Sequence, residues 1–367
     1  MFAKKAMIFV LMLAFCACLG FAGGSSDSGK SKDSSTGASS GGSAARANNQ
    51  PDWIRDPYAK FDKQSYVAAR GNGNSLQAAE KSALGNLVAV FGQSIMVSDV
   101  ITTSYQQAIS SGVIANWSEN TNVDSLIATS AGMDTLIGAE IGDSWDNGKG
   151  EYYALAVLNK TKALATYSNM IQSNQAIIKN LVGNLSEAQK NSLDGFARYQ
   201  FAATIADISI SYGNVLSVIG APAFARELKP GDDYRLEALN ITKTIPIGIT
   251  VKNDKSGRVQ GAFAKVFSEM GFRSGGSGSR YILNVNIIVS PVDLPANPNQ
   301  FVRMELSADL VDTASGVVLL PYNFNERQGH NTVSEAENRT FLEAERKIAR
   351  DYKDLLSNYL SQLLPRK

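Results

Sequence analysis

The chain begins with an apolar stretch that contains its only two cysteines. Lys4 and Lys5 precede a run from Ala6 to Ala22 in which almost every residue is apolar, and Cys16 and Cys18 lie near its end. The run is shorter than the roughly 20 apolar residues that a transmembrane helix needs, and polar residues follow it at once. A basic start, an apolar segment and small residues around a cysteine are typical of a bacterial lipoprotein signal peptide. This beginning is therefore predicted to direct export and to take no part in the mature fold.

The position of cleavage decides how the chain is attached. Cleavage before Cys18 would place small Ala17 at the cut, whereas cleavage before Cys16 would place bulky Phe15 there. Cys18 is therefore the predicted lipid-attachment residue, carrying acyl chains such as palmitate, as in other bacterial lipoproteins; two or three such chains hold a protein at a membrane almost permanently. Two alternatives stay open, namely ordinary secretion with cleavage after Ala22, and an uncleaved anchor.

A tract rich in Gly and Ser follows the signal peptide of residues 1–17. Ser, Gly, Ala and Asn dominate residues 18–50, and a tract with so few apolar side chains cannot offset the entropy cost of ordering. It is predicted to be a disordered tether with a root-mean-square span of roughly 30 Å. The packed fold is expected in residues 51–367, which are enough for two or three domains.

The composition excludes several kinds of chemical site. His330 is the only histidine and no cysteine follows Cys18, so disulfides, cysteine nucleophiles and multi-histidine metal sites lack the residues they need. A Ser-His-Asp triad would have to use His330, which we interpret as a loop or capping residue in the turn-like stretch Gln328–Asn331. No catalytic residue, cofactor or metal is therefore predicted.

The charge balance adds a further exclusion and leaves one alternative. Removing residues 1–17 takes away Lys4 and Lys5 and no acidic residue, so the formal net charge of +1 becomes −1. A near-neutral chain with interspersed charges lacks the basic patch of a nucleic-acid-binding protein. The sequence does not show which of the 34 acidic residues lie close together in the fold. A hydrolase that uses a pair of carboxylates therefore remains an alternative function.

Strand and helix patterns alternate in residues 51–158. They predict a strand at Ser65–Arg70, a break at Gly71–Gly73, a helix from Leu76 to Phe91 capped by Asn74 or Ser75, a strand at Ile95–Thr103, and a hairpin of Met133–Trp145 with Glu151–Leu158. The two glycines invite a dinucleotide-binding interpretation, but Leu76 stands where that fingerprint needs a third glycine. A tight turn into the helix explains them without a phosphate.

These residues resemble a known family. Four segments are similar to the LPP-twenty lipoprotein family. They are the stretch Tyr66–Gly73, the Ala-rich helix around Ala78–Ala83, the strand Ile95–Val100, and Trp145 followed by Tyr152–Ala156. Related domains occur at the N-terminus of flagellar assembly protein T. The resemblance implies a small α/β domain with a helix packed on a sheet, in an envelope lipoprotein without an assigned enzymatic activity.

Residues 159–225 are predicted to be helical. Apolar residues recur every seven positions at Leu164, Ile171, Ile178 and Leu185. After an interruption, a capping-box pattern at Ser186–Gln189 predicts that a new helix begins. A second apolar face contains Phe196, Ala203, Ile210, Tyr199, Ala206 and Gly213. An antiparallel helical hairpin is favoured, and a dimerising coiled coil is the alternative.

Residues 241–367 are predicted to form a second α+β domain. The patterns indicate a strand at Ile245–Val251, a helix through Val259–Phe267 that ends at Gly271, strands at Tyr281–Val289, Val302–Leu310 and Val317–Tyr322, and a helix from Val333 to Leu364 with an apolar face at Ala344, Ile348, Tyr352, Leu355, Tyr359 and Leu363. The order β-α-β-β-β-α predicts a two-layer sandwich. A run of mixed charges in the last helix is interpreted as a solvated face: Glu343, Glu345, Arg346, Lys347, Arg350 and Asp351. The Pro-rich loop Ser290–Asn299 is interpreted as a spacer, and a contact loop is the alternative.

Together these features predict two small α/β sandwich domains joined by a helical hairpin, after a disordered tether. The expected function is non-catalytic binding or scaffolding in envelope or flagellar assembly, with a carboxylate-pair hydrolase and a surface adhesin or antigen as alternatives. The expected partners are the membrane, through the lipid on Cys18, and envelope proteins or peptidoglycan. The periplasmic face of the outer membrane is the expected location, ahead of the inner membrane or the cell surface.

Overall fold

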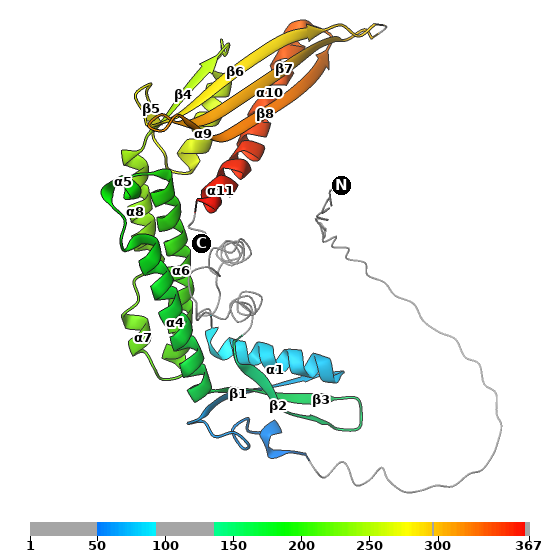
Figure 1. Ribbon diagram of the computed structural model, residues 1–367. Helices are drawn as coiled ribbons and strands as arrows, with labels where there is room; N and C mark the ends of the chain where they lie inside the picture. Colours follow the sequence, from blue (N-terminus) through cyan, green and yellow to red (C-terminus); the bar gives the residue numbers. More distant parts are fainter. Residues whose placement is uncertain (1–49, 93–135, 296, 364–367) are drawn as a thin grey trace, which may run out of the picture. The chain divides into compact units, whose positions relative to one another are not determined.

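The computed structural model describes residues 50–92, 136–295 and 297–363, and its elements form two sheets and a set of helices (Figure 1). Helices segregate from antiparallel or mixed sheets, so the predicted α+β fold is confirmed. Four predictions lie outside the described residues: the signal peptide of residues 1–17, the lipid-attachment residue Cys18, the tether, and the strand Ile95–Thr103.

The N-terminal sheet contains three antiparallel strands in the order β1-β3-β2. Their bounds are β1 Tyr66–Gly73, β2 Ala139–Asp146 and β3 Tyr152–Asn159, so the predicted hairpin is confirmed, although its first strand begins later than expected. Helix α1 (Leu76–Val90) lies along one face of this sheet (Figure 1) and buries Ala79, Ala83 and Leu87 against it. The Ser75 hydroxyl accepts a hydrogen bond from the Ala78 N–H and caps the helix, as predicted.

Gly71 and Gly73 do not break the strand, so that prediction is wrong. Both residues pair with β3, and β1 continues through them. A Cβ atom on Gly71 would lie 2.1 Å from the amide nitrogen of Ala83, and one on Gly73 would lie 2.7 Å from the Cβ of Ala78. The glycines are therefore required because α1 packs directly on the backbone of β1.

The segment before β1 covers the opposite face of the N-terminal sheet. Trp53 and Ile54 are buried there in a separate apolar cluster with Leu155 and Val157 of β3. The Trp53 indole Nε1–H donates to Asp143 Oδ2 over 2.9 Å, and Lys60 Nζ lies 2.8 Å from the same oxygen. Asp143 of β2 therefore fastens this segment to the sheet.

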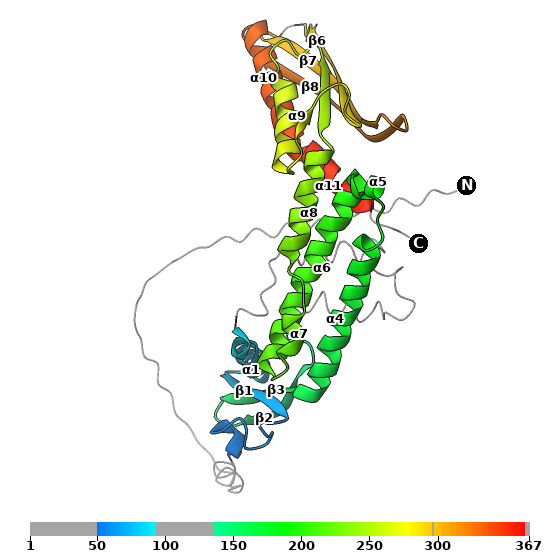
Figure 2. The same cartoon turned by 90° about the vertical axis from the view of Figure 1, so that its left-hand side faces the viewer.

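The central helices have the bounds α4 Lys160–Val182, α5 Glu187–Lys190, α6 Leu193–Val218, α7 Ala223–Arg226 and α8 Gly231–Thr244 (Figure 2). Helices α4 and α6 are antiparallel, because Tyr167 contacts Tyr212 ring to ring at 5.5 Å and Asn174 donates to Ser209 over 3.1 Å. The predicted helical hairpin is confirmed, as is the capping box at Ser186 that begins α5.

Helix α8 is an element that the sequence analysis did not predict. It packs on α6, where the Arg235 guanidinium pairs with Asp207 and the Gly231 N–H donates to the same carboxylate over 3.2 Å. A Cβ atom on Gly231 would lie 2.2 Å from Asp207 Oδ1, so only glycine fits at the start of α8.

Helix α6 is the core of this helical group. It is long and apolar enough to cross a membrane by length and composition alone, but 61% of its most apolar window is buried inside the protein. That burial is the pattern of a core helix that packs against α4 on one side and α8 on another.

The C-terminal sheet has five strands in the order β5-β4-β6-β7-β8. The bounds are β4 Ile247–Lys252, α9 Arg258–Glu269, β5 Ser274–Gly275, β6 Tyr281–Val292, β7 Gln300–Asp312, β8 Val317–His330, α10 Val333–Lys347 and α11 Lys353–Gln362. Helices α9 and α10 lie on one face of the sheet (Figure 2), and the alternating apolar side chains of β6 and β7 are buried beneath them. The predicted two-layer order is confirmed, with the two-residue strand β5 as an addition.

One turn of π-helix, Ile348–Tyr352, joins α10 to α11. The sequence pattern places Leu355, Tyr359 and Leu363 on the buried face, yet the structure buries Leu356 and Leu360 more deeply. A π-turn holds one residue more than an α-turn, so the buried face of α11 is displaced by one position. An α-helical period cannot anticipate this displacement.

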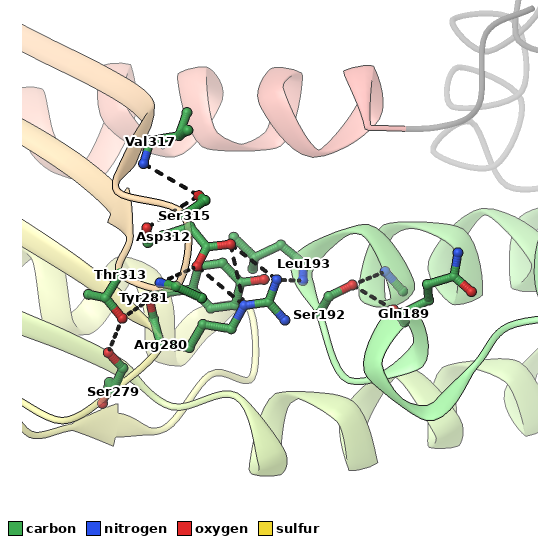
Figure 3. Close-up of polar contacts among 12 residues, drawn as sticks. Gln189, Ser192, Leu193, Ser279, Arg280, Tyr281, Asp312, Thr313, Ser315 and Val317 are labelled. Atoms are coloured by element: carbon green, nitrogen blue, oxygen red, sulfur yellow. Dashed lines mark hydrogen bonds and ion pairs between the residues drawn. The ribbon is translucent and has the colours of Figure 1, made fainter.

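The first turn of α6 is hydrogen-bonded to the C-terminal domain (Figure 3). The Leu193 N–H donates to the Tyr281 hydroxyl over 3.3 Å, and the neighbouring Arg280 pairs with Asp312 at 3.1 Å. The Phe196 and Phe272 rings lie 4.9 Å apart. Apolar and polar contacts thus connect the helices to the C-terminal sheet.

Three surface interpretations need correction. The predicted loop Ser290–Asn299 begins later, because strand β6 pairs with β7 as far as Val292. His330 ends strand β8 opposite Gln300 rather than lying in a loop, and its Nδ1 is buried without a hydrogen-bond partner in the described residues. The mixed-charge run is only partly solvated, because Glu345 pairs with Arg258 of α9 at 2.6 Å and Lys347 pairs with Glu326 of β8 at 2.9 Å. These pairs attach α10 to the elements beside it.

Candidate ligand-binding cleft

The described residues hold no preformed metal centre. No group of three or more His, Cys, Asp or Glu side chains within them is arranged to bind a metal ion. The one predicted site residue, Cys18, lies outside the described ranges, so its lipid attachment stays a prediction.

The carboxylates were the remaining candidates for catalysis. Four of them have a clearly changed pKa, and in all four the pKa is lowered. Partial burial raises the pKa of Glu326, but the hydrogen bonds from Lys347, Gln328 and the Arg327 N–H, together with the positive charge of Lys347, outweigh it. In Asp143 the bonds from Lys60, Ser144 and Trp53, together with the charge of Lys60, outweigh burial in the same way. A general acid needs the opposite shift, so these four carboxylates are suited to structural hydrogen bonds and ion pairs.

A cleft of about 480 Å³ opens between α4, α6 and α8, and we call it the helical cleft. Its lining residues come from four helices and two loops: Gln175, Ile178, Lys179, Val182, Gly183, Lys190, Tyr199, Ala206, Ser209, Glu227, Leu228, Lys229, Tyr234 and Glu237. The volume lies within the range of small-molecule sites. It forms because α4 and α8 both pack on α6 and leave a space between them.

Ion pairs and rings order one side of the helical cleft. Lys190 Nζ lies 3.0 Å from Glu237 Oε2 and 5.7 Å from the centre of the Tyr199 ring. The hydrogen bond with Glu237 raises the pKa of Lys190, which keeps this ammonium charged. Lys190 therefore links α5 to α8 across the mouth of the cleft.

The loop before α8 supplies a second cation. Lys229 Nζ lies 4.8 Å from the centre of the Tyr234 ring, and burial, followed by the negative charge of Asp233, raises the pKa of that tyrosine. The Tyr234 hydroxyl therefore stays protonated and can donate a hydrogen bond at neutral pH. Lys179 adds a third ammonium from α4.

The chemistry of the helical cleft favours holding a ligand. Its lining is apolar at Ile178, Val182 and Leu228, and it also carries three lysines, two glutamates and two tyrosines. An apolar lining with a few polar groups is the usual pattern of a binding site. Glu237 is engaged by Lys190, so the cleft contains no pair of free carboxylates for hydrolysis.

The sequence analysis named Tyr199 but missed the other main groups of the cleft. Lys190, Lys229 and Tyr234 are scattered along the chain and meet only because α8 returns along α6. Signals for α8 were present: Pro230 precedes acidic residues in the first turn, and Ala238 and Ile241 follow Tyr234 at helical spacing.

The comparisons with known proteins give a family match for part of the chain. Residues 51–159 match the family model described as LPP20 lipoprotein. The predicted resemblance to the LPP-twenty lipoprotein family is therefore confirmed for the N-terminal sheet and its helix. No curated protein matches the chain.

Several solved structures are similar to parts of the chain. A candidate lipoprotein from Caulobacter crescentus CB15 covers 30% of this chain and 90% of its own, with 16% identity and a TM-score of 0.24. A minor lipoprotein from Acinetobacter baumannii covers 32% and 93%, with 11% identity and a TM-score of 0.23. The secreted protein HP1454 from Helicobacter pylori covers 82% and 99%, with 11% identity and a TM-score of 0.37. At these values the likenesses carry no argument about function.

Proposed function

We propose that this protein is a lipid-anchored lipoprotein of the bacterial envelope that binds a ligand in the helical cleft without transforming it. The family match of residues 51–159 supports the lipoprotein class. The observation that carries the binding role is the cleft itself, where apolar side chains lie beside three lysines that outnumber its two glutamates. A ligand with an apolar part and an acidic group fits both features.

The proposal includes the organisation of the chain around that cleft. Residues 1–17 form the signal peptide, residues 18–50 the lipidated tether, and residues 51–158 the LPP20-like domain. Residues 159–225 form the helical segment and residues 241–367 the C-terminal domain. The periplasmic face of the outer membrane is the proposed location, and the ligand belongs to envelope or flagellar assembly.

The anchoring is tested with Cys18→Ser. We expect wild-type protein in the membrane fraction with a lipid-modified Cys18 by intact mass, and the variant in the soluble fraction. An unmodified chain that begins at Gly23 would contradict the anchor, because it would show ordinary secretion.

The binding role is tested by native mass spectrometry of protein extracted from membranes. We expect an additional bound mass that Tyr234→Ala loses and Leu236→Ala keeps, because Tyr234 lines the cleft while Leu236 is an exposed residue of the same helix outside it. A bound mass lost equally in both variants, or absent from the wild type, would argue against the cleft as the site. Release of fragments from purified envelope polymers by the wild type would favour the hydrolase alternative.

Protease treatment of intact cells separates the periplasmic proposal from the surface adhesin. A periplasmic protein stays intact until the outer membrane is opened, whereas an adhesin is cut at once.

A further inference from the structure

The open face of the C-terminal sheet carries two arginines side by side. Arg303 of β7 and Arg327 of β8 are directly opposed in the antiparallel register, so both side chains rise from the same face. Their neighbours Val302 and Met304 are buried under the helices, which places Arg303 and Arg327 on the face away from them. Like charges in directly opposed positions destabilise a sheet.

No carboxylate in the described residues neutralises this pair, although other arginines in those residues have ion pairs. The acid on the same face of β7, Glu305, instead accepts a hydrogen bond from Asn325 at 3.5 Å. Arg327 contacts only a ring, with its guanidinium carbon 5.8 Å from the centre of Phe301. The positive charge of the pair is therefore uncompensated within the described structure.

A second observation points to a missing acceptor. The Nε–H of Arg303 is buried and has no hydrogen-bond partner in the described residues. A buried guanidinium donor without an acceptor is costly, because water no longer solvates it. On the other side of Arg303, strand β6 places Ser290 directly opposite, and its hydroxyl is a further donor on this face.

The ring beside the pair is fixed by the backbone. A Cβ atom on Gly329 would lie 2.4 Å from the ring of Phe301, so the ring occupies the place of a side chain there. The Arg327 guanidinium lies against the Phe301 ring, so the ring limits the positions that this guanidinium can take. A guanidinium held in this way can present its paired N–H groups to a planar anion.

We propose that Arg303, Arg327 and Ser290 form a binding site for an oxyanion, a carboxylate or phosphate group presented by an envelope component. Two guanidinium groups can offer parallel N–H donors to two oxygens of one anion. The bound anion would neutralise both charges and accept the bond that Arg303 Nε–H lacks. This site lies on the C-terminal sheet and does not depend on the helical cleft.

The test uses thermal melting of the full chain with Cys18→Ser, in potassium phosphate, potassium acetate or potassium chloride of equal ionic strength. We expect phosphate or acetate to raise the melting temperature by about 2–5 °C over chloride, and the better anion identifies the chemical source. Arg327→Gln, which changes an exposed side chain, should abolish this rise and should itself melt higher than the wild type at low salt without the anion.

Arg273→Gln is the matched control, because Arg273 is an exposed arginine of the same domain. It should keep the full anion-dependent rise. The proposal is overturned if both anions act like chloride on the wild type, or if Arg327→Gln and Arg273→Gln respond equally. Arg303→Gln should behave like Arg327→Gln, provided that its circular dichroism spectrum matches the wild type.

Discussion

At Gly71 the absence of a side chain sets the distance between strand β1 and helix α1. Gly71→Ala would push a Cβ atom against the backbone at Ala83, and backbone cannot move aside as a flexible side chain can. We expect the free energy of unfolding to fall by about 1–3 kcal/mol, the usual range for overpacking. Urea denaturation monitored by tryptophan fluorescence measures this change, since Trp53 and Trp145 lie in the same domain.

Gly85→Ala is the control for that substitution. Gly85 lies in α1 with open space where a Cβ would be, so alanine there should stabilise the protein by about 0.5–1 kcal/mol. A loss of stability in both variants would mean that α1 tolerates no change, and would refute the role given to close packing at Gly71.

Asp143 is a carboxylate of the N-terminal domain with a lowered pKa. Partial burial raises its pKa, but the bonds from Lys60, Ser144 and Trp53 together lower it below the ordinary value. A lowered folded-state pKa gives stability that is present above about pH 4 and is lost as the pH falls through the folded-state pKa.

Asp143→Ala leaves the buried Trp53 N–H without its acceptor. We expect a loss of about 1–3 kcal/mol at pH 7, the cost of an unsatisfied buried donor. The difference from the wild type should shrink below about pH 4 in urea titrations. An unchanged difference down to pH 2 would show that the ionised carboxylate contributes nothing.

Among the elements, α4 and α6 are held in register by a polar pair inside an apolar interface. Asn174 and Ser209 are both buried, and the amide of Asn174 donates to the hydroxyl of Ser209. We expect a double-mutant cycle of Asn174→Ala and Ser209→Ala to give a coupling of about 1 kcal/mol. Additive single changes would show that the pair does not act as a unit.

The elements also show what a sequence can and cannot predict. The seven-residue repeat in α4 and the alternation in β6 and β7 predict helix and strands correctly, because one face of each is buried over most of its length. Gly71 was misread as a turn, because a glycine required by a close helix looks the same in sequence as one required by a bend. The π-turn at Ile348–Tyr352 was missed because local periodicity contains no sign of an extra residue per turn.

In the molecule as a whole, the side chains that line the helical cleft come together from distant positions in the sequence, and sequence reasoning did not assemble them. Lys190 and Lys229 belong to different elements, and only the packing of α8 on α6 brings them to one cleft. Cys18 was inferred from a local pattern that needs no tertiary structure. The helical cleft can be found only once the fold is known, whereas a lipid-attachment cysteine can be predicted from the sequence around it.

The bond between Leu193 and Tyr281 tests whether the helices and the C-terminal sheet stabilise each other. Tyr281→Phe removes the acceptor of a buried N–H in the first turn of α6, and we expect a loss of about 1 kcal/mol. Hydrogen exchange should become faster in the peptide that contains Leu193. Tyr152→Phe, a half-buried tyrosine of β3, should leave this exchange unchanged.

Because of the π-turn, the packing of α11 depends more on the number of residues before it than on the identity of any one side chain in the turn. Helix α10 contacts β7 and β8, whereas α11 contacts α6, so one continuous helix meets two partners at different angles around its axis. Deleting a single residue within Ile348–Tyr352 would restore regular α-helix and rotate every later side chain by roughly 100°. Leu356 and Leu360 would then turn out of their contacts although each remains present, whereas deletion of a residue beyond Leu360 would have little effect. A conservative point substitution in this turn changes one contact, but a one-residue deletion changes the orientation of all of α11.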